Sequence, residues 1–430
     1  MNKPLPFGAE KSRIFYGWWI VAAGCINQGL ITLTIGRAFG SYAVLLENDF
    51  GWSKTALSGA YSLQQVESGL LGPVQGTLID RFGPKASMRF GILLFGLGFI
   101  AFSQINTLTM FYVCYLMLAI GSSLGGFFPV NVVIANWFHR QRARAFSISQ
   151  LGGAIGGLLI PIVAIMLETL GWRTTALISG VVILCVGLPL NEVIRRRPED
   201  HGLQVDGLPP APEIERPVTS VDSPQRDFTL REAMHTPAFW LISLGHGSAL
   251  LIVSVVNVHI VFHLTEGPGY SFSGAATVVA LITAGQILGT LLGGIIGDRF
   301  DKRMIAVGCM LFHTLALLMV AHSALLGVVI LFALLHGTAW GLRGPMMQAI
   351  RADYFGRTAY GAILGVSSLI ITFGTISGPV AAGYLADRTG DYVFGFTVLA
   401  LLSGLGSVFF LLAKRPALPA HSPVLEASKV

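Results

Sequence analysis

One apolar stretch of the sequence, LLHGTAWGLRGPMMQAI at residues 334–350, contains an arginine. His336, Trp340 and Arg343 follow at spacings of four and three residues, so on a helix they share one face. A guanidinium binds a carboxylate through two parallel hydrogen bonds, and an indole adds an apolar or cation–π wall. We therefore expect this face to bind a small carboxylate with a hydrophobic body. The alternatives are that Arg343 bonds a helix carbonyl, closes an inner gate or extends to the membrane surface.

Two other charged groups lie inside apolar runs. Arg37 is in the outer half of the first run, at a different depth from Arg343, so we expect successive anion sites, or one site and one gate. Glu67 is the only carboxylate well inside a run, and it adjoins a polar stripe that includes Tyr61 and Gln64. A carboxylate away from water is costly to keep charged. We predict that Glu67 carries a proton, with an ion pair to an arginine as the alternative.

The histidines inside apolar runs divide into two groups. His246 and Asn257 are eleven residues apart, about three turns, and share a face of a run that we expect to line a cavity. Both are therefore candidate substrate-binding residues, as His336 is. His313 is expected to be peripheral, with its hydrogen bonds satisfied.

The composition indicates which class of protein carries these residues. Hydrophobic residues make up 53% of the 430 and charged residues 12%, whereas a soluble domain has roughly 25% charged residues. The chain is therefore a polytopic membrane protein, and its net charge of +6 indicates topology and not a nucleic-acid site. The four cysteines show no metal-ligand spacing, and no metal motif or nucleophile elbow is found. We expect no cofactor, no metal and no enzymatic activity.

Twelve runs are long enough to span a bilayer. They lie at residues 16–46, 54–79, 86–104, 107–136, 145–169, 172–193, 237–265, 272–296, 303–322, 324–350, 359–386 and 391–413. This predicts an all-α membrane protein of twelve transmembrane helices in two six-helix bundles. A polar, proline-rich segment at 195–236 predicts a cytoplasmic linker between domains at 1–194 and 237–430. Basic residues, Arg351 among them, concentrate on the side of this linker, which predicts cytoplasmic N- and C-termini.

The two halves of the sequence repeat one another. GTLIDRFGPK and GIIGDRFDKR place Asp80 and Arg81 at an offset of 218 from Asp298 and Arg299. Repetition at this period predicts two parallel six-helix repeats with a binding site near the midplane between them. Each carboxylate is expected to accept hydrogen bonds from a facing helix N-terminus, and each arginine to bridge neighbouring helices.

The first of these motifs resembles the G-x-x-x-D-R-x-G-x-[KR] signature of the major facilitator superfamily of secondary transporters, with Pro84 where that family often has arginine. FYGWWIV, FGWSKTALSGAYS and GWR, which begin at residues 15, 50 and 171, resemble the branch of monocarboxylate transporters and oxalate/formate exchangers. The resemblance implies transport of small organic anions. Arg37 falls near a basic residue that functions in that branch. The charge pair of the eighth helix and the lysine of the eleventh helix in that branch have no counterpart here.

The resemblance also implies a mechanism and partners. It implies alternating access by rocking of two bundles around a cavity lined by the first, fourth, seventh and tenth helices, with the Asp–Arg loops locking the outward-facing state. The expected partners are a small organic anion, protons or a counter-anion, and the lipid bilayer, for a monomer in an inner or plasma membrane. The alternative is a drug or metabolite exporter of the same fold, with a wider cavity and structural arginines. A membrane enzyme or receptor is disfavoured, because the sequence shows no catalytic cluster.

Overall fold

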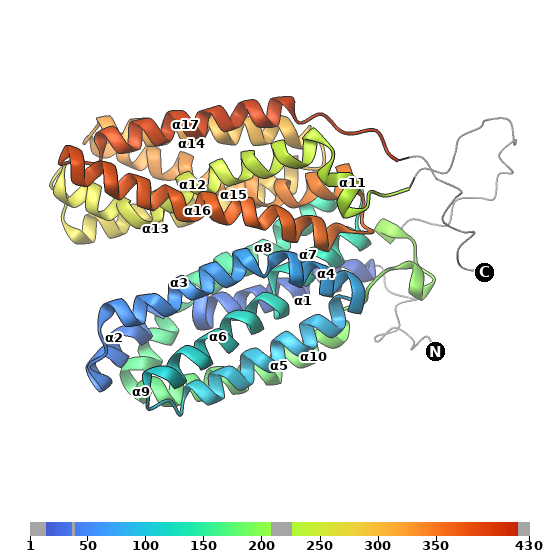
Figure 1. Cartoon of the computed structure of the whole chain (residues 1–430), viewed down its shortest axis with the longest axis horizontal. Coiled ribbons are helices and arrows are strands. Elements are labelled where there is room, and N and C mark those ends of the chain that lie inside the picture. Colours follow the sequence, from blue (N-terminus) through green and yellow to red (C-terminus); the bar gives the residue numbers. More distant parts are fainter. Residues whose placement is uncertain (1–13, 37–38, 208–225, 420–430) are drawn as a thin grey trace, which may run out of the picture.

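The computed structural model describes residues 14–36, 39–207 and 226–419, which are almost entirely helical (Figure 1). The first half comprises α1 Tyr16–Ile31, η1 Thr32–Gly36, α2 Phe39–Phe50, α3 Lys54–Leu70, α4 Gly72–Phe82, α5 Pro84–Phe102, α6 Leu108–Gly125, α7 Phe127–Trp137, α8 Arg142–Leu158, α9 Ile160–Val182, η2 Ile183–Gly187 and α10 Leu188–Val193. The short elements η3 Glu199–His201, η4 Val205–Gly207 and α11 Leu230–Met234 follow. The second half comprises α12 Pro237–Glu266, α13 Phe272–Ile296, α14 Lys302–His322, α15 Leu326–Phe355, α16 Tyr360–Thr389 and α17 Val393–Leu412.

The predicted fold of twelve membrane-spanning helices is confirmed, and several crossings contain a break. α1 and α2, α3 and α4, and α6 and α7 are each two pieces of one crossing. α8 and the first part of α9 form the fifth crossing, and the chain then turns at Gly171, whose φ of +74° suits glycine. Ten stretches are long and apolar enough to span a membrane by themselves. The one at 142–193 contains two crossings, and the more polar α3–α4 supplies the remaining one.

Local sequence explains where these helices begin and break. Four of the membrane-spanning helices begin with a side-chain oxygen that accepts a hydrogen bond, at 3.1–3.3 Å, from the backbone N–H three residues on. These caps of α3, α6, α12 and α13 are Ser53, Thr107, Thr236 and Ser271. Pro73 and Pro161 lie in the first turns of α4 and α9, where proline is tolerated, and mark the breaks before those helices.

The helices form two bundles that lie side by side (Figure 1). α1 to α10 make up the N-terminal bundle, and α12 to α17 make up the C-terminal bundle. The described parts of the linker, with η3, η4 and α11, and both ends of the described chain lie at one end of the molecule, here called the linker end. The bundles converge there, and their ribbons diverge toward the opposite end. The domain limits expected at residues 194 and 236 stay a prediction.

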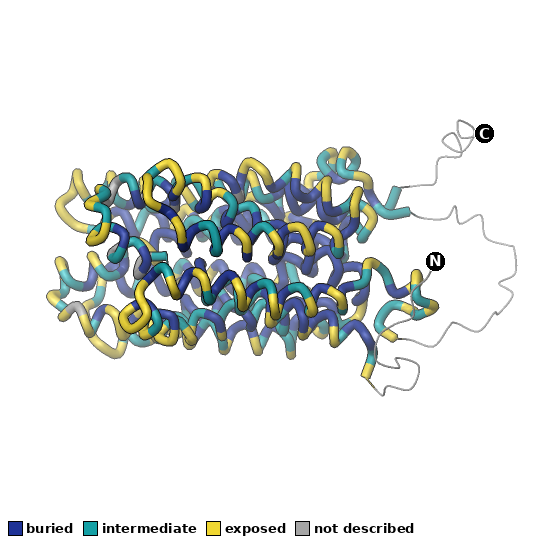
Figure 2. Tube along the Cα trace, turned by 90° about the horizontal axis from the view of Figure 1, so that it is seen from below, coloured by how far each residue is buried: buried dark blue, intermediate teal, exposed yellow. Residues whose placement is uncertain are grey.

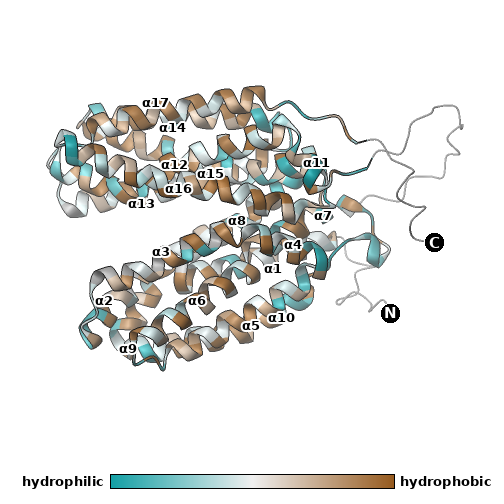
Figure 3. Ribbon diagram, viewed as in Figure 1, coloured by the Kyte–Doolittle hydropathy of each residue, from teal (hydrophilic) through white to brown (hydrophobic). Residues whose placement is uncertain are grey.

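Glycines allow close helix packing inside each bundle, as in other membrane bundles. Gly152 of α8 faces the carbonyl of Cys25 in α1, and Gly289 of α13 faces the carbonyl of Thr338 in α15. A Cβ at either glycine would overlap that oxygen. Buried residues lie between the helices, and many large apolar side chains remain exposed on them (Figures 2 and 3). Exposed apolar helices of this length suit a lipid surrounding.

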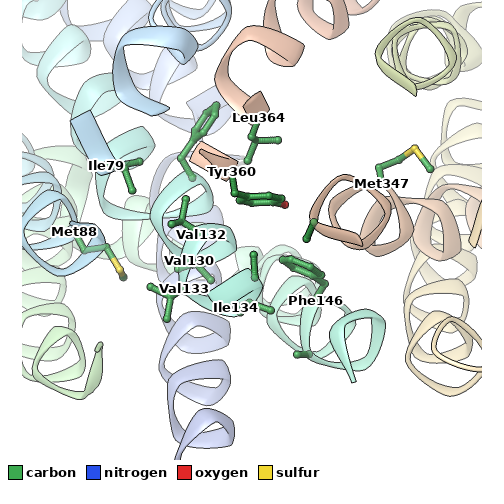
Figure 4. Close-up of a cluster of buried hydrophobic side chains, with 14 of the residues drawn as sticks. Ile79, Met88, Val130, Val132, Val133, Ile134, Phe146, Met347, Tyr360 and Leu364 are labelled. Carbon is green, nitrogen blue, oxygen red and sulfur yellow. The ribbon is translucent and has the colours of Figure 1, made fainter. Parts of the chain in front are cut away.

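An apolar cluster fills the space between the bundles near the linker end (Figure 4). Ile134 of α7 and Phe146 of α8 come from the N-terminal bundle. Met347 of α15 and Tyr360 and Leu364 of α16 come from the C-terminal bundle, and all five are buried. The linker end is therefore closed in this structure.

Candidate functional site

Asp80, at the end of α4, joins the N-terminal bundle to the start of α16. Its carboxylate accepts hydrogen bonds from the backbone N–H groups of Gly361 at 3.2 Å and Ala362 at 2.8 Å. A negative charge is favourable at this helix N-terminus. The helices approach closely here because Gly76 faces the carbonyl of Gly361, where a Cβ would overlap the oxygen.

Asp298, after α13, makes the equivalent contact with the start of α8. Its carboxylate accepts hydrogen bonds from the backbone N–H groups of Ala143 at 2.8 Å and Arg144 at 3.0 Å. Burial raises the pKa of Asp298, and these two hydrogen bonds oppose the rise without cancelling it. The closed linker end thus holds two carboxylates on two helix N-termini.

Two arginines, Arg142 and Arg357, form further contacts between the bundles at the same end of the molecule. Arg142 of α8 is buried and forms an ion pair with Asp353 of α15, with Nη1 and Oδ1 2.7 Å apart. Lys302 reaches the same carboxylate at 2.9 Å. Arg357, after α15, donates from Nη1 to the carbonyl of Asn136 at 2.9 Å.

The prediction that Arg81 and Arg299 bridge neighbouring helices is wrong for this conformation. Both side chains are exposed. Among the described residues, Arg81 contacts only the ring of Phe82 beside it, and Arg299 has no side-chain hydrogen bond or ion pair. Both arginines are exposed where α4 and α13 end, whereas the aspartates before them bond backbone N–H groups of the other bundle.

Arg343 lies inside the C-terminal bundle, with only 1% of its surface exposed. Its Nε and Nη1 atoms have no hydrogen-bond partner among the described residues. The thiol of Cys309 in α14 and the guanidinium of Arg351 act on it, and no described carboxylate does. A buried arginine without a counter-charge is costly. The N–H groups of Nε and Nη1 can donate hydrogen bonds to a carboxylate or another small anion.

His336 lies on the same helix and pairs with a histidine of α14. Nδ1 of His336 is 3.2 Å from Nδ1 of His313, and neither side chain is exposed. The charge of Arg343 acts on both rings. The expectation that His313 is peripheral is therefore wrong, because α14 packs directly against α15 and brings the two rings together.

His246 of α12 is bonded to Arg351, which the sequence had placed among the cytoplasmic basic residues. Arg351 is 1% exposed, because α15 continues to Phe355 and its side chain turns into the bundle. It donates from Nη2 to Nδ1 of His246 at 3.1 Å, to Ser367 of α16 at 3.0 Å, and from Nη1 to the carbonyl of Met347 at 2.8 Å. Arg351 is therefore part of a buried network, and the cytoplasmic side expected for it stays a prediction. The two buried arginines of α15 differ. The guanidinium nitrogens of Arg351 all have hydrogen-bond partners, whereas Nε and Nη1 of Arg343 have none among the described residues.

Trp340 and Asn257, the other candidates of this bundle, lie apart from Arg351. Trp340 is half-buried and packs against the apolar cluster of the C-terminal bundle. Asn257 is exposed on α12 and makes no described hydrogen bond, so the structure does not bring it to His246.

Glu67 is buried in the N-terminal bundle. Oε1 accepts a hydrogen bond from Nε2 of Gln75 at 2.7 Å, and Oε2 accepts one from the hydroxyl of Ser123 at 3.4 Å. α3, α4 and α6 thus meet at this carboxylate. Its neighbour Gln64 accepts a hydrogen bond from the hydroxyl of Tyr115 at 2.9 Å.

Two further candidates of the N-terminal bundle cannot be placed beside these residues. Arg37 and the side chain of Tyr61 lie outside the described residues, although Tyr61 belongs to α3.

A cavity of about 320 Å³ lies between the two bundles. Its polar wall consists of Gln28, Thr32, Gln150 and Gln286. Nε2 of Gln150 and Oε1 of Gln286 are buried and have no partner among the described residues. Gly344, which follows Arg343, packs against Gln150, since a Cβ there would lie 2.8 Å from Oε1. Arg343 is thus one residue from the helix surface that meets this wall.

The sequence interpretation missed Gln150 and Gln286. The signal was available, because each is a lone amide within a glycine-rich apolar run, at SQLGGAIGG and AGQILG. A polar side chain at such a position has to face protein or a cavity.

The family model of the Major Facilitator Superfamily matches residues 24–284 and 242–429 of this chain. The chain belongs to the major facilitator superfamily. It is a transporter by family and not an enzyme, as predicted.

Several relatives of known name are similar to this chain over most of their length, and two of them are monocarboxylate transporters. It is 24% identical to monocarboxylate transporter 12 of Mus musculus, over 91% of this chain and 84% of that protein. It is 27% identical to monocarboxylate transporter 11 of Homo sapiens, over 98% of this chain and 87% of that protein. The MFS transporter asaE of Aspergillus flavus is 26% identical, over 84% of this chain and 78% of that protein.

Solved structures of the superfamily share the fold. The human organic anion transporter MFSD10 superposes with a TM-score of 0.69 at 15% identity, covering 92% of this chain and 99% of that one. The E. coli fucose:proton symporter FucP superposes with a TM-score of 0.70 at 14% identity, covering 93% and 100%. At these identities the likeness concerns the fold alone.

Proposed function

We propose that this protein is a secondary transporter of a small organic anion of the monocarboxylate type, working by alternating access. The observation that carries the proposal is Arg343, which is buried and whose Nε and Nη1 have no partner among the described residues. A second buried arginine lies on the same helix, and among the described residues of α12–α17 no Asp or Glu is buried. An interior of that charge favours an anion. The names of the monocarboxylate transporter relatives support the same class.

The proposed substrate site combines both bundles. Arg343 holds the carboxylate, with His336 and Trp340 on the same helix. His246 and Asn257 contribute from α12, and Arg37, Tyr61 and Gln64 contribute from the N-terminal bundle. The amide-lined cavity between the bundles is the proposed approach to Arg343, because Gln150 forms part of its wall and packs on Gly344.

Coupling and gating follow from the same arrangement. Glu67 is one candidate proton carrier, and exchange for a second anion is the alternative to proton coupling. The Asp80–Arg81 and Asp298–Arg299 loops are the proposed gate, in which the aspartates make the contacts. With the termini and linker on the cytoplasmic side of an inner or plasma membrane, the closed linker end makes this the outward-facing conformation of a monomer.

Uptake into proteoliposomes tests the proposal. Radiolabelled lactate, pyruvate, oxalate and benzoate are offered with and without an imposed pH gradient. We expect saturable uptake or exchange of at least one of these anions, lost in Arg343→Gln while the variant inserts and remains monodisperse. Absence of uptake and exchange for all four would refute the function, and wild-type affinity in Arg343→Gln would refute the site. Unchanged proton coupling in Glu67→Gln would remove Glu67 from the mechanism.

A second candidate is an exporter of a neutral drug or metabolite. It is favoured by the cavity wall, whose polar side chains are amides and one hydroxyl and whose described lining contains no charged residue. This candidate predicts binding of neutral solutes that Arg343→Gln leaves unchanged. Competition of neutral aromatic amides against anion uptake separates the two.

A further inference from the structure

Two histidines face each other inside the C-terminal bundle, on helices that pack together. Nδ1 of His313 in α14 lies 3.2 Å from Nδ1 of His336 in α15, and the ring centroids are 4.6 Å apart. Neither side chain is exposed. Nε2 of each ring is buried and has no partner among the described residues. Each ring therefore uses one nitrogen in the pair and has the other available.

This contact fixes the protons that the pair holds. A hydrogen bond between two Nδ1 atoms needs one proton, so one neutral ring donates from Nδ1 and has a bare Nε2. The other ring accepts at Nδ1 and carries its proton on Nε2. One more proton, taken from water, can bind at the bare Nε2. That step forms one N–H bond, breaks none within the pair, and leaves a net charge of +1 and two Nε2–H donors.

The surroundings of the pair contain positive charge and no described counter-charge. Arg343 acts on both rings, and it also acts on His246 of α12 and on Cys309 of α14. α13 and α17, which pack against α15 and α14, contain no titratable residue. No carboxylate of the described residues acts on either ring. A proton on the pair is therefore opposed by the burial of the rings and by the charge of Arg343.

We propose that the His313–His336 pair is the proton site of this transporter, and that it is occupied together with an anion held by Arg343. A carboxylate on Arg343 cancels the charge that opposes the proton, and the protonated pair adds attraction for the carboxylate. Each ligand thus strengthens binding of the other, which is the thermodynamic requirement for symport. The inference rests on the proposed anion site at Arg343.

The pair competes with Glu67 for this role. Glu67 lies in the other bundle, where its carboxylate accepts hydrogen bonds from Gln75 and Ser123. The histidine pair is beside Arg343. The proton that accompanies the anion therefore binds at the histidines.

The test compares proton-driven uptake with exchange in His313→Asn and His336→Asn, because asparagine keeps a polar atom at the Nδ1 position and does not titrate. Proteoliposomes are assayed with lactate, pyruvate, oxalate and benzoate. In the wild type, an inward gradient of about one pH unit raises accumulation by up to about tenfold. We expect both variants to lose this stimulation. His313→Asn, whose residue lies outside the proposed substrate site, should keep anion-for-anion exchange within about twofold. The matched control is His263→Gln, a buried histidine of α12 whose Nε2 bonds the carbonyl of Val320 at 2.8 Å; it should behave as the wild type.

A second measurement does not depend on folding of the histidine variants. Purified protein in weak buffer is mixed with the transported anion, and proton uptake is followed with a pH indicator. We expect about one proton per bound anion in the wild type and in Glu67→Gln. Full pH stimulation in both histidine variants, or loss of proton uptake in Glu67→Gln, would overturn the inference and leave anion transport standing. Absence of any anion uptake would instead refute the proposed function.

Discussion

Asp80 and Asp298 are separated by 218 positions in the sequence and make the same contact in space. Each carboxylate ends one helix of its bundle and accepts two backbone hydrogen bonds from the first turn of a helix in the other bundle. The bundles are therefore held together at the linker end by two equivalent contacts, here called latches. One is made by Asp80 of the first half and the other by Asp298 of the second half. Opening this end breaks four charge-assisted hydrogen bonds, so the latches bias the equilibrium between the closed and open forms.

Replacement of one latch aspartate should shift the protein toward the open form. In Asp298→Asn the carboxamide still accepts one hydrogen bond, but its NH₂ group faces a second backbone N–H. We expect a loss of about 1–3 kcal/mol for the closed form. Spin labels at positions 140 and 414, both exposed at the linker end, report the distance between bundles. Asp301→Asn is the matched control, because Asp301 caps its own helix α14 and joins no other element. Equal distance distributions in both variants would contradict the latch.

The raised pKa of Asp298 predicts a pH dependence of closure. Burial raises this pKa in the closed form, and opening returns the carboxyl to water and to its ordinary pKa. The closed form therefore binds the proton more tightly. Lowering the pH through the interval between the two pKa values should favour closure, and raising it should favour opening.

The same spin-label pair measures this dependence between about pH 4 and pH 8. Asp298→Asn should remove the part of the pH response that belongs to this carboxyl. A closed fraction that rises with pH in the wild type, and does so equally in Asp298→Asn, would show that other groups govern closure.

A side chain at position 76 should be incompatible with the closed form of the linker end and compatible with the open form. A Cβ at this position would overlap the carbonyl oxygen of Gly361 across the interface between the bundles. Gly76→Leu is therefore expected to hold the linker end open and to reduce exchange by at least about tenfold. Gly308→Leu is the control, because a Cβ at that glycine of α14 meets no atom within 4 Å. Normal exchange in Gly76→Leu would mean that the helices separate without cost.

The sequence predicted the repeated features of the fold well. Twelve apolar runs and the offset between Asp80 and Asp298 follow from composition and periodicity, because lipid requires long helices and the repeat places equivalent residues equivalently. The backbone contacts of the two aspartates were expected for the same reason. Their arginines were not predicted correctly, since the direction of a long side chain at a helix end depends on the neighbouring helix.

The buried cluster of the C-terminal bundle was only partly predictable. His336 and Arg343 share a helix face, which spacing reveals. The partner His313 belongs to another helix, and a single sequence does not show which faces of two helices meet. Arg351 follows the predicted run by one residue, so its burial depended on α15 continuing to Phe355. Helix limits are the least certain feature of a sequence interpretation.

The two buried arginines of α15 should respond oppositely to the same substitution. Both are 1% exposed, but Arg351 bonds His246, Ser367 and a carbonyl, whereas two nitrogens of Arg343 have no described partner. Arg343→Gln removes an uncompensated buried charge, so without anion it should raise stability by about 1–4 kcal/mol. Arg351→Gln breaks a satisfied network and should lower stability.

Thermal unfolding of the purified proteins, with and without lactate, pyruvate, oxalate and benzoate, measures both effects. A stabilising shift by one of these anions should be present in the wild type and absent in Arg343→Gln. If Arg343→Gln were as destabilising as Arg351→Gln, Arg343 would be a structural residue and the anion site would lie elsewhere.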